Sequence, residues 1–164
     1  MSDDLRVAAT AVLDVCRTKK IKVASAESCT GGLVAGALTD IAGSSDVLDR
    51  GFVTYSNDAK HEVLGVPRDI IDTHGAVSRE TAEAMARGAL GKASADVVVA
   101  ITGIAGPGGG TKEKPVGLVH FAAASRNGVL VHKEIRYGDL GRIGVRRKSV
   151  LQALLMLRNL ADRR

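Results

Sequence analysis

The feature that most constrains the fold is an apolar run at residues 96–102, DVVVAIT, which leads directly into a glycine-rich segment. A strand that is nearly all apolar is typical of one that is covered on both faces of its sheet. Stretches with helical spacing of apolar residues at 5–19, 33–41 and 78–92 can supply the two covering layers. The chain is therefore expected to be an α/β protein with helices on both sides of a sheet.

Four further stretches have the composition of strands. Residues 21–26 and 51–55 are each followed by a predicted helix, as in a parallel sheet. Residues 116–124 and 129–137 flank Arg126-Asn127-Gly128, a sequence that favours a tight hairpin turn. The hairpin adds an antiparallel pair, so the sheet should be mixed and mostly parallel.

The rest of the chain completes this architecture. Residues 142–162 have the apolar spacing of a final helix, and residues 67–75, bounded by a proline and a glycine, are predicted to be irregular. There is no internal repeat and no linker. We predict a three-layer α/β/α sandwich formed by residues 1–164 as a single domain.

The charge distribution narrows the range of partners. Residues 133–164 carry nine basic and three acidic side chains, whereas residues 1–132 carry 14 and 15. The net charge of +5 thus arises in one terminal element, and the four aromatic residues offer little for base stacking. The chain shows no signal peptide, no bilayer-spanning stretch and no CxxC motif. We expect a cytoplasmic protein that binds neither nucleic acid nor membrane.

The stretch AESCTGG at residues 26–32 is the first candidate for chemistry. Ser28 follows a predicted strand, and Thr30, Gly31 and Gly32 lead into a helix whose N-terminal N–H groups and dipole favour anions. Such a place suits a nucleophile whose oxyanion is held by main-chain donors. A helix cap made by Ser28 or Thr30 is the alternative. The lack of a GxSxG motif disfavours an ordinary α/β-hydrolase.

The stretch YSNDAK at residues 55–60 is the second candidate. Tyr55 follows a predicted strand, and Lys60 lies in the first turn of the next helix. A lysine can act as the general base for a serine nucleophile when burial or a neighbouring cation lowers its pKa. An exposed surface lysine and a core tyrosine remain open as alternatives.

The segment TGIAGPGGGT at residues 102–111 is the third candidate. Glycine costs backbone entropy, so this density indicates main chain that approaches a ligand closely and points N–H groups toward it. Neither Walker A nor GxGxxG spacing fits, which disfavours a nucleoside triphosphate or dinucleotide cradle. A flexible surface loop is the alternative. The candidate binding residues are Thr102, Gly103, Gly106, Gly109, Gly110 and Thr111.

Other polar residues carry weaker signals. Arg142 and Arg146 share one helical face, where a guanidinium can bind a phosphate, although a solvated basic face fits equally. The histidines have no metal-ligand spacing, so we expect no metal site; His120 and His132 can be neighbours across two strands. Cys16 has the position of a small buried side chain.

Taken together, AESCTGG, YSNDAK, TGIAGPGGGTKEKPVG and the terminal R-x-x-V-R pattern resemble the C-terminal domain of the competence/damage-inducible CinA family. The resemblance covers nearly the whole chain. Where the family often has Gly-Asp-Arg before its last helix, Leu140 and Gly141 here separate Asp139 from Arg142. An insertion of two residues restores the register, so Arg142 is the best match to the family's arginine.

The resemblance implies a nicotinamide mononucleotide amidase of pyridine nucleotide salvage that needs no cofactor. It implies that Ser28 is the nucleophile and that Tyr55 and Lys60 assist proton transfer. It also implies that Thr102 and the glycine segment shape the site and that Arg142 binds or activates the substrate. For the oxyanion we expect N–H groups of residues 30–32 or of the glycine segment.

Two points stay open at this stage. A non-catalytic nucleotide-binding module with a regulatory role is the main alternative to an enzyme. We expect a homo-oligomer, although the small-residue helix at residues 33–38 can pack closely against either a sheet or a second subunit.

Overall fold

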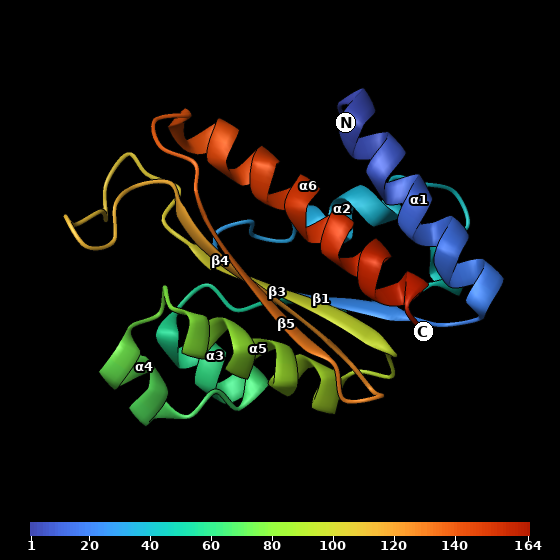
Figure 1. Ribbon diagram of the computed structural model, residues 1–164, viewed down its shortest axis with the longest axis horizontal. Helices are drawn as coiled ribbons and strands as arrows, with labels where there is room; N and C mark the ends of the chain where they lie inside the picture. Colours follow the sequence, from blue (N-terminus) through green and yellow to red (C-terminus); the bar gives the residue numbers. More distant parts are fainter.

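The computed structural model describes residues 1–164, in which helices and strands alternate along the chain (Figure 1). The strands are β1 (Val23–Glu27), β2 (Leu48–Val53), β3 (Val97–Gly103), β4 (Leu118–Ser125) and β5 (Leu130–Arg136). The helices are α1 (Asp3–Lys19), α2 (Leu33–Thr39), the short 3₁₀ helix η1 (Ser44–Asp46), α3 (Asn57–Leu64), α4 (Arg68–His74), α5 (Arg79–Lys92) and α6 (Gly141–Asp162). None of these helices is long and apolar enough to cross a lipid bilayer.

The five strands form one sheet in the order β2-β1-β3-β4-β5. β1 pairs in parallel with both β2 and β3, while β3–β4 and β4–β5 are antiparallel. The predicted hairpin turn joins β4 to β5, so the expectation of a mixed sheet is confirmed. Because β1, β2 and β3 run the same way, their carboxyl ends meet at one edge of the sheet.

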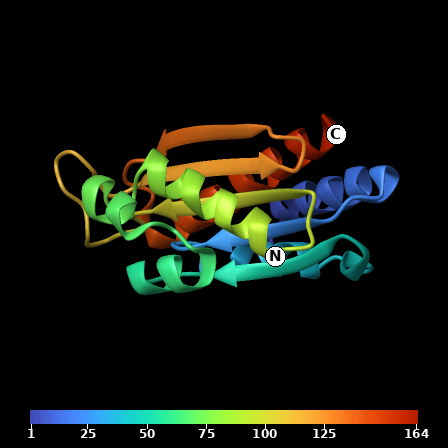
Figure 2. The same ribbon diagram turned by 90° about the horizontal axis from the view of Figure 1, so that it is seen from below.

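Helices cover both faces of the sheet, and the predicted three-layer arrangement is confirmed. α1, α2 and α6 lie over one face, and α3, α4 and α5 lie over the other (Figures 1 and 2). β3 is central and buried: Val97, Val99 and Ile101 contribute to the core under α1 and α6, while Val98 and Ala100 contribute to the core under α5. This alternation explains why its sequence is apolar throughout.

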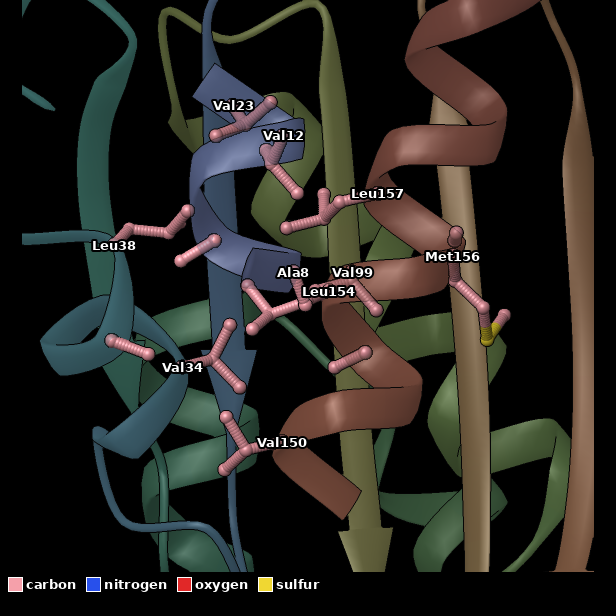
Figure 3. Packing of buried hydrophobic residues seen from close by; sticks show 14 of the residues in the cluster. Ala8, Val12, Val23, Val34, Leu38, Val99, Val150, Leu154, Met156 and Leu157 are labelled. Carbon is pink, nitrogen blue, oxygen red and sulfur yellow. The ribbon is translucent and has the colours of Figure 1, made fainter. Parts of the chain in front are cut away.

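The two cores differ in the size of their side chains. The core under α1, α2 and α6 is built from larger aliphatic residues, among them Val12, Val34, Leu154 and Leu157 (Figure 3). The core under α5 is rich in alanine, which lets that helix approach the sheet and its neighbours closely. At Gly88 of α5, an added Cβ would lie only 1.9 Å from the main-chain oxygen of Leu64.

The small-residue helix α2 packs against the rest of the chain with one face. It contacts α1, α6, β1 and β2, and its residues Val34, Ala37 and Leu38 are buried. At the closest approach, a Cβ added to Gly51 of β2 would lie 2.9 Å from the Cβ of Ala35. Leu33 and Gly36 are exposed on the opposite face, and no atom lies within 4 Å of the Cβ position of Gly36.

The prediction of an irregular stretch at residues 67–75 was wrong, because Arg68–His74 form the helix α4. Pro67 occupies the N-cap position, where its lack of an N–H costs nothing, and Asp69 lies in the favourable first turn. Gly75 ends the helix with a positive φ of 82°. The proline and the glycine thus mark the two ends of a short helix.

Candidate active site

The candidate residues from three separate stretches meet at the carboxyl edge of the parallel strands. Ser28 follows β1, Tyr55 follows β2, and Thr102 lies at the end of β3. Together with Lys60 of α3 and Arg142 of α6, they line a cleft of about 180 Å³. The other residues that line this cleft are Cys29, Asn57, Ala76, Val77, Gly103 and Ala105.

Lys60 is the most unusual side chain in this cleft, because only 1% of its surface is exposed. Its Nζ lies 3.1 Å from Ser28 Oγ, 3.1 Å from the main-chain oxygen of Thr54 and 3.2 Å from that of Tyr55. No carboxylate pairs with it. The alternative of an exposed surface lysine therefore does not hold, and a lysine in contact with a serine is a pair suited to nucleophilic catalysis.

The surroundings of Lys60 act on its charge in two ways: burial disfavours the ammonium, while the three oxygens around Nζ can accept from it. Burial lowers the pKa of the Lys60 ammonium from its ordinary value of 10.5. The oxygens of Thr54 and Tyr55 can only accept hydrogen bonds, so both hydrogens of a neutral amine have a partner. In the structure Nζ also donates to Ser28 Oγ, whose own hydroxyl lies 3.5 Å from the main-chain oxygen of Tyr55. In a neutral amine the third position on Nζ is a lone pair, which can accept the Ser28 hydrogen instead.

Cys29, the neighbour of Ser28, is not set up as a nucleophile. Burial raises the pKa of its thiol to about 11, so the thiol stays protonated near neutral pH. Cys16 and Cys29 are both free and buried, as expected for Cys16. Of the adjacent Ser28 and Cys29 side chains, it is the Ser28 hydroxyl that contacts the Lys60 amine.

Three consecutive carbonyl oxygens in the turn that carries Ser28 accept hydrogen bonds. The oxygen of Ser28 accepts from Gly31 N, that of Cys29 from Arg146 Nε, and that of Thr30 from Leu33 N. N–H and C=O point in opposite directions across a trans peptide. The N–H groups of Cys29 and Thr30 have no acceptor in the chain. Cys29 lines the cleft, whereas Thr30 is fully buried, and Thr30, Gly31 and Gly32 do not line it.

A buried carboxylate, rather than Ser28 or Thr30, caps the helix that follows. Glu27 is fully buried, and its two oxygens accept from the N–H groups of Val34 and Ala35 at 2.9 and 3.1 Å. Ser25 Oγ donates to the same carboxylate. The first free N–H groups of α2 are thus occupied by Glu27, and the Cys29 N–H is left at the cleft without an acceptor in the chain.

Tyr55 and Arg142 bridge the cleft between β2 and α6. Arg142 donates from Nη2 to Tyr55 Oη at 3.0 Å and from Nη1 to the main-chain oxygen of Gly106 at 2.8 Å. Tyr55 is 59% exposed, so it is not a core aromatic. Its carbonyl contacts Lys60, while its hydroxyl accepts from Arg142 and keeps its own hydrogen available.

The first residues of the glycine-rich segment lie at the site, and the rest of the segment projects away from it (Figure 1). Thr102 Oγ1 donates to the oxygen of Ala76, and Gly103 lines the cleft. Gly109, Gly110 and Thr111 do not line it; Thr111 exchanges hydrogen bonds with Lys114 in a local turn.

Several of these glycines serve the packing of the loop itself, which the sequence interpretation did not foresee. A Cβ added at Gly106 or Gly110 would lie 2.5 or 2.7 Å from atoms of Val116, and one at Gly103 would lie 2.7 Å from Val119. Only Gly108 has open space and an ordinary φ. The packing of the loop therefore requires glycine at positions 103, 106 and 110, whether or not a ligand is bound.

Sequence reasoning missed two charged residues of the site. Glu27 lies one position beyond the predicted strand, and a charged residue at the end of an apolar strand was the available signal. Arg146 was recognised only as part of a basic face, although it holds the turn that carries Ser28. The two buried side-chain oxygens without a partner, Thr30 Oγ1 and Thr54 Oγ1, also lie in this region, as is common at functional sites.

His120 and His132 are neighbours on β4 and β5, in agreement with the sequence. Their rings are 5.2 Å apart, with Nδ1 of His120 2.9 Å from Nε2 of His132. Burial lowers the pKa of both imidazoles. No cluster of three or more His, Cys, Asp or Glu side chains with the geometry of a metal site is found in the chain.

The fold and the site define an α/β/α domain with a serine–lysine pair at the carboxyl edge of its parallel strands. A model of the CinA C-terminal domain matches residues 6–161. The chain belongs to the CinA C-terminal domain family, as the motifs implied.

Individual relatives show the extent of this similarity. The chain is 58% identical over 118 residues to the nicotinamide-nucleotide amidohydrolase PncC of Enterobacter agglomerans, covering 71% of this chain and 72% of that protein. It is 50% identical over 151 residues to a CinA-like protein of Synechococcus sp. strain RCC307, covering 92% of this chain and 36% of that protein. The chain spans about a third of the length of such CinA-like and competence-damage relatives.

A solved structure shows the same fold along almost the whole chain. The competence/damage inducible protein CihA of Agrobacterium tumefaciens has a TM-score of 0.96 and 55% sequence identity to this chain. The match covers 98% of this chain and 97% of that one.

Proposed function

We propose that this protein is an amidase that hydrolyses the carboxamide of nicotinamide mononucleotide to nicotinate mononucleotide and ammonia. The observation that carries the proposal is the 3.1 Å contact between buried Lys60 and Ser28 at a cleft. The name of the Enterobacter agglomerans relative supports the choice of substrate. On this proposal the protein acts in pyridine nucleotide salvage in the cytoplasm.

In the first half of the reaction, Ser28 Oγ attacks the carboxamide carbon while its proton passes to the neutral Lys60 amine. The negative charge that develops on the carboxamide oxygen is held by the N–H group of Cys29, which lines the cleft and has no acceptor in the chain. When the carbon–nitrogen bond breaks, the Lys60 ammonium returns the proton to the leaving nitrogen. Ammonia departs, and an ester of Ser28 remains.

In the second half, a water molecule attacks the ester carbonyl and gives a proton to Lys60. The Cys29 N–H also holds the second oxyanion. As the carbon–oxygen bond to Ser28 breaks, Lys60 returns the proton to Ser28 Oγ. The product is released as a carboxylic acid that loses its proton to solvent, and the serine–lysine pair is restored without any cofactor.

The rim of the cleft fits the remainder of a nucleotide. A volume of about 180 Å³ is below the usual range for pockets that enclose a whole ligand, so we place the pyridine ring inside and the ribose phosphate at the rim. Arg142 lies there with N–H groups left over for a phosphate. The Tyr55 hydroxyl can donate its hydrogen to the substrate, and Thr102 and Gly103 shape the wall.

The test is ammonia release from nicotinamide mononucleotide by the wild type, Ser28→Ala and the control Ser94→Ala. Ser94 is an exposed serine whose hydroxyl makes no hydrogen bond. We expect Ser28→Ala to lose at least about 10³-fold in kcat and Ser94→Ala to keep wild-type activity. Full activity in Ser28→Ala would contradict the role of Ser28. A folded wild type that binds the nucleotide without releasing ammonia would instead indicate a non-catalytic binding module.

A further inference from the structure

Arg146 links the final helix to the turn that carries Ser28. It lies one helical turn after Arg142 on α6 and is half-buried. Its Nε donates to the main-chain oxygen of Cys29 at 3.0 Å, and its Nη2 lies 3.4 Å from that of Thr30. One guanidinium thus contacts two consecutive carbonyls of the turn.

The turn has little else to fix the peptide between Cys29 and Thr30. Gly31 and Gly32 have φ values of 59° and 100°, and no side chain caps α2 at Gly32. Gly31 N holds the oxygen of Ser28, and Leu33 N holds that of Thr30, but the oxygen of Cys29 has Arg146 as its only donor. The direction of the Thr30 N–H, across the same peptide plane, therefore depends on Arg146.

We infer that Arg146 is a positioning residue for the reaction at Ser28. By fixing the Cys29 carbonyl, it holds the peptide between Cys29 and Thr30 in place and keeps Ser28 in register with Lys60. This inference rests on the proposed function for its reaction but not for its geometry. Because Arg146 acts through the turn, it supports the transition state more than the binding of the ground state.

The experiment compares Arg146→Ala, Arg146→Lys and the control Arg147→Ala. Arg147 is the next residue, but it is exposed and pairs with Asp4 instead of the turn. We expect Arg146→Ala to lower kcat for ammonia release about 100-fold while KM stays within about threefold. Arg146→Lys should fall between Arg146→Ala and the wild type, since an ammonium can hold one carbonyl. Arg147→Ala should match the wild type.

A second readout separates this inference from the choice of substrate. A fluorophosphonate probe, which loses fluoride as Ser28 Oγ bonds to its phosphorus, reports the nucleophile and its oxyanion donors without any nucleotide. We expect Arg146→Ala to be labelled at least tenfold more slowly, with an unfolding midpoint close to that of Arg146→Lys. If the wild type labels but releases no ammonia, the proposed substrate fails, and the labelling rates still decide the role of Arg146.

Two results overturn the inference. One is wild-type kcat and wild-type labelling rate in Arg146→Ala. The other is a loss in Arg146→Ala that Arg146→Lys does not partly recover and that appears in KM instead of kcat, which would make Arg146 a substrate-binding residue. A wild type that neither labels at Ser28 nor releases ammonia overturns both the reaction at Ser28 and the positioning role.

Discussion

The turn after β1 and the loop after β3 are both glycine-rich and both begin at the same edge of the sheet, yet they are built differently. The turn at residues 28–32 is held by Lys60 from α3 and by Arg146 from α6, and Glu27 of β1 anchors the helix α2 that follows it. The loop at residues 104–117 meets the site only at its start and then projects outward (Figure 1). Two of its glycines, Gly106 and Gly110, pack against its own Val116.

The difference separates two uses of glycine that look alike in a sequence. In the turn, positive φ values at Gly31 and Gly32 let the main chain reverse direction between β1 and α2. In the loop, missing side chains let two segments of the same loop lie close together. We therefore expect changes in and around the turn to reduce activity much more than changes in the outer part of the loop.

Removal of the Lys60 amine should have the largest effect on the turn. We expect Lys60→Met to lose at least about 10³-fold in kcat/KM, because Ser28 then has no base. Lys92→Met, at the exposed end of α5, is the matched control and should remain active. Lys60→Met that keeps more than a tenth of wild-type kcat/KM for ammonia release would contradict the account.

The Lys60→Met variant should also differ from the wild type in how its stability changes with pH. Since burial lowers the pKa of Lys60, the unfolded chain binds more protons between the folded-state pKa and 10.5, and stability should rise with pH across that interval. Lys60→Met should lack this rise. Urea denaturation of both proteins at several pH values between 7 and 10.5 measures it, and identical pH dependence would contradict a lowered pKa.

Loss of the Glu27 carboxylate should destabilise the end of β1 and the start of α2. Glu27→Ala leaves two N–H groups and the Ser25 hydroxyl without their buried acceptor, and we expect a loss of about 2–4 kcal/mol in the free energy of unfolding. Glu27→Gln keeps one good acceptor and should lose less. Glu62→Gln, on an exposed part of α3, should be neutral. Chemical denaturation with all three variants checks this order.

The smallest effects come from single glycines in the two regions. Gly32 has a φ of 100°, so Gly32→Ala should cost about 1–2 kcal/mol and lower activity about tenfold by disturbing the turn. Gly108 has an ordinary φ and open space around its Cβ position, so Gly108→Ala should leave both stability and activity within experimental error or raise stability slightly. If Gly32→Ala and Gly108→Ala are both folded at the assay temperature and lose the same activity, the distinction between turn and loop fails.

Much of the fold could be predicted because periodicity and turn residues act locally. The apolar run of β3 predicted a strand covered on both faces, and Asn127-Gly128 predicted the hairpin. The helix α4 was missed because a proline and a glycine seven or eight residues apart can bound either a loop or a short helix. Nothing in the local pattern distinguishes the two without the packing of Ile71 in the core.

The site was harder to predict because its geometry depends on residues far apart in the chain. Ser28, Lys60 and Arg142 could be proposed from their motifs, but the burial of Lys60 and the bond from Arg142 to Tyr55 are tertiary facts. The same holds for Arg146, which reaches Cys29 across 117 positions of sequence. Glycine spacing likewise did not reveal that Val116 packs against Gly106 and Gly110.

The central claim is that the neutral form of the Lys60 amine takes the proton of Ser28. The most direct measurement is an NMR titration of the Lys60 Nζ and Cε signals in protein with isotopically labelled lysine, assigned by their absence in Lys60→Met. We expect a pKa clearly below the ordinary 10.5, and kcat/KM for ammonia release that rises with pH and levels off at the same pKa. A Lys60 pKa at or above 10.5, or a rate that does not rise with pH through the measured pKa, would contradict the account.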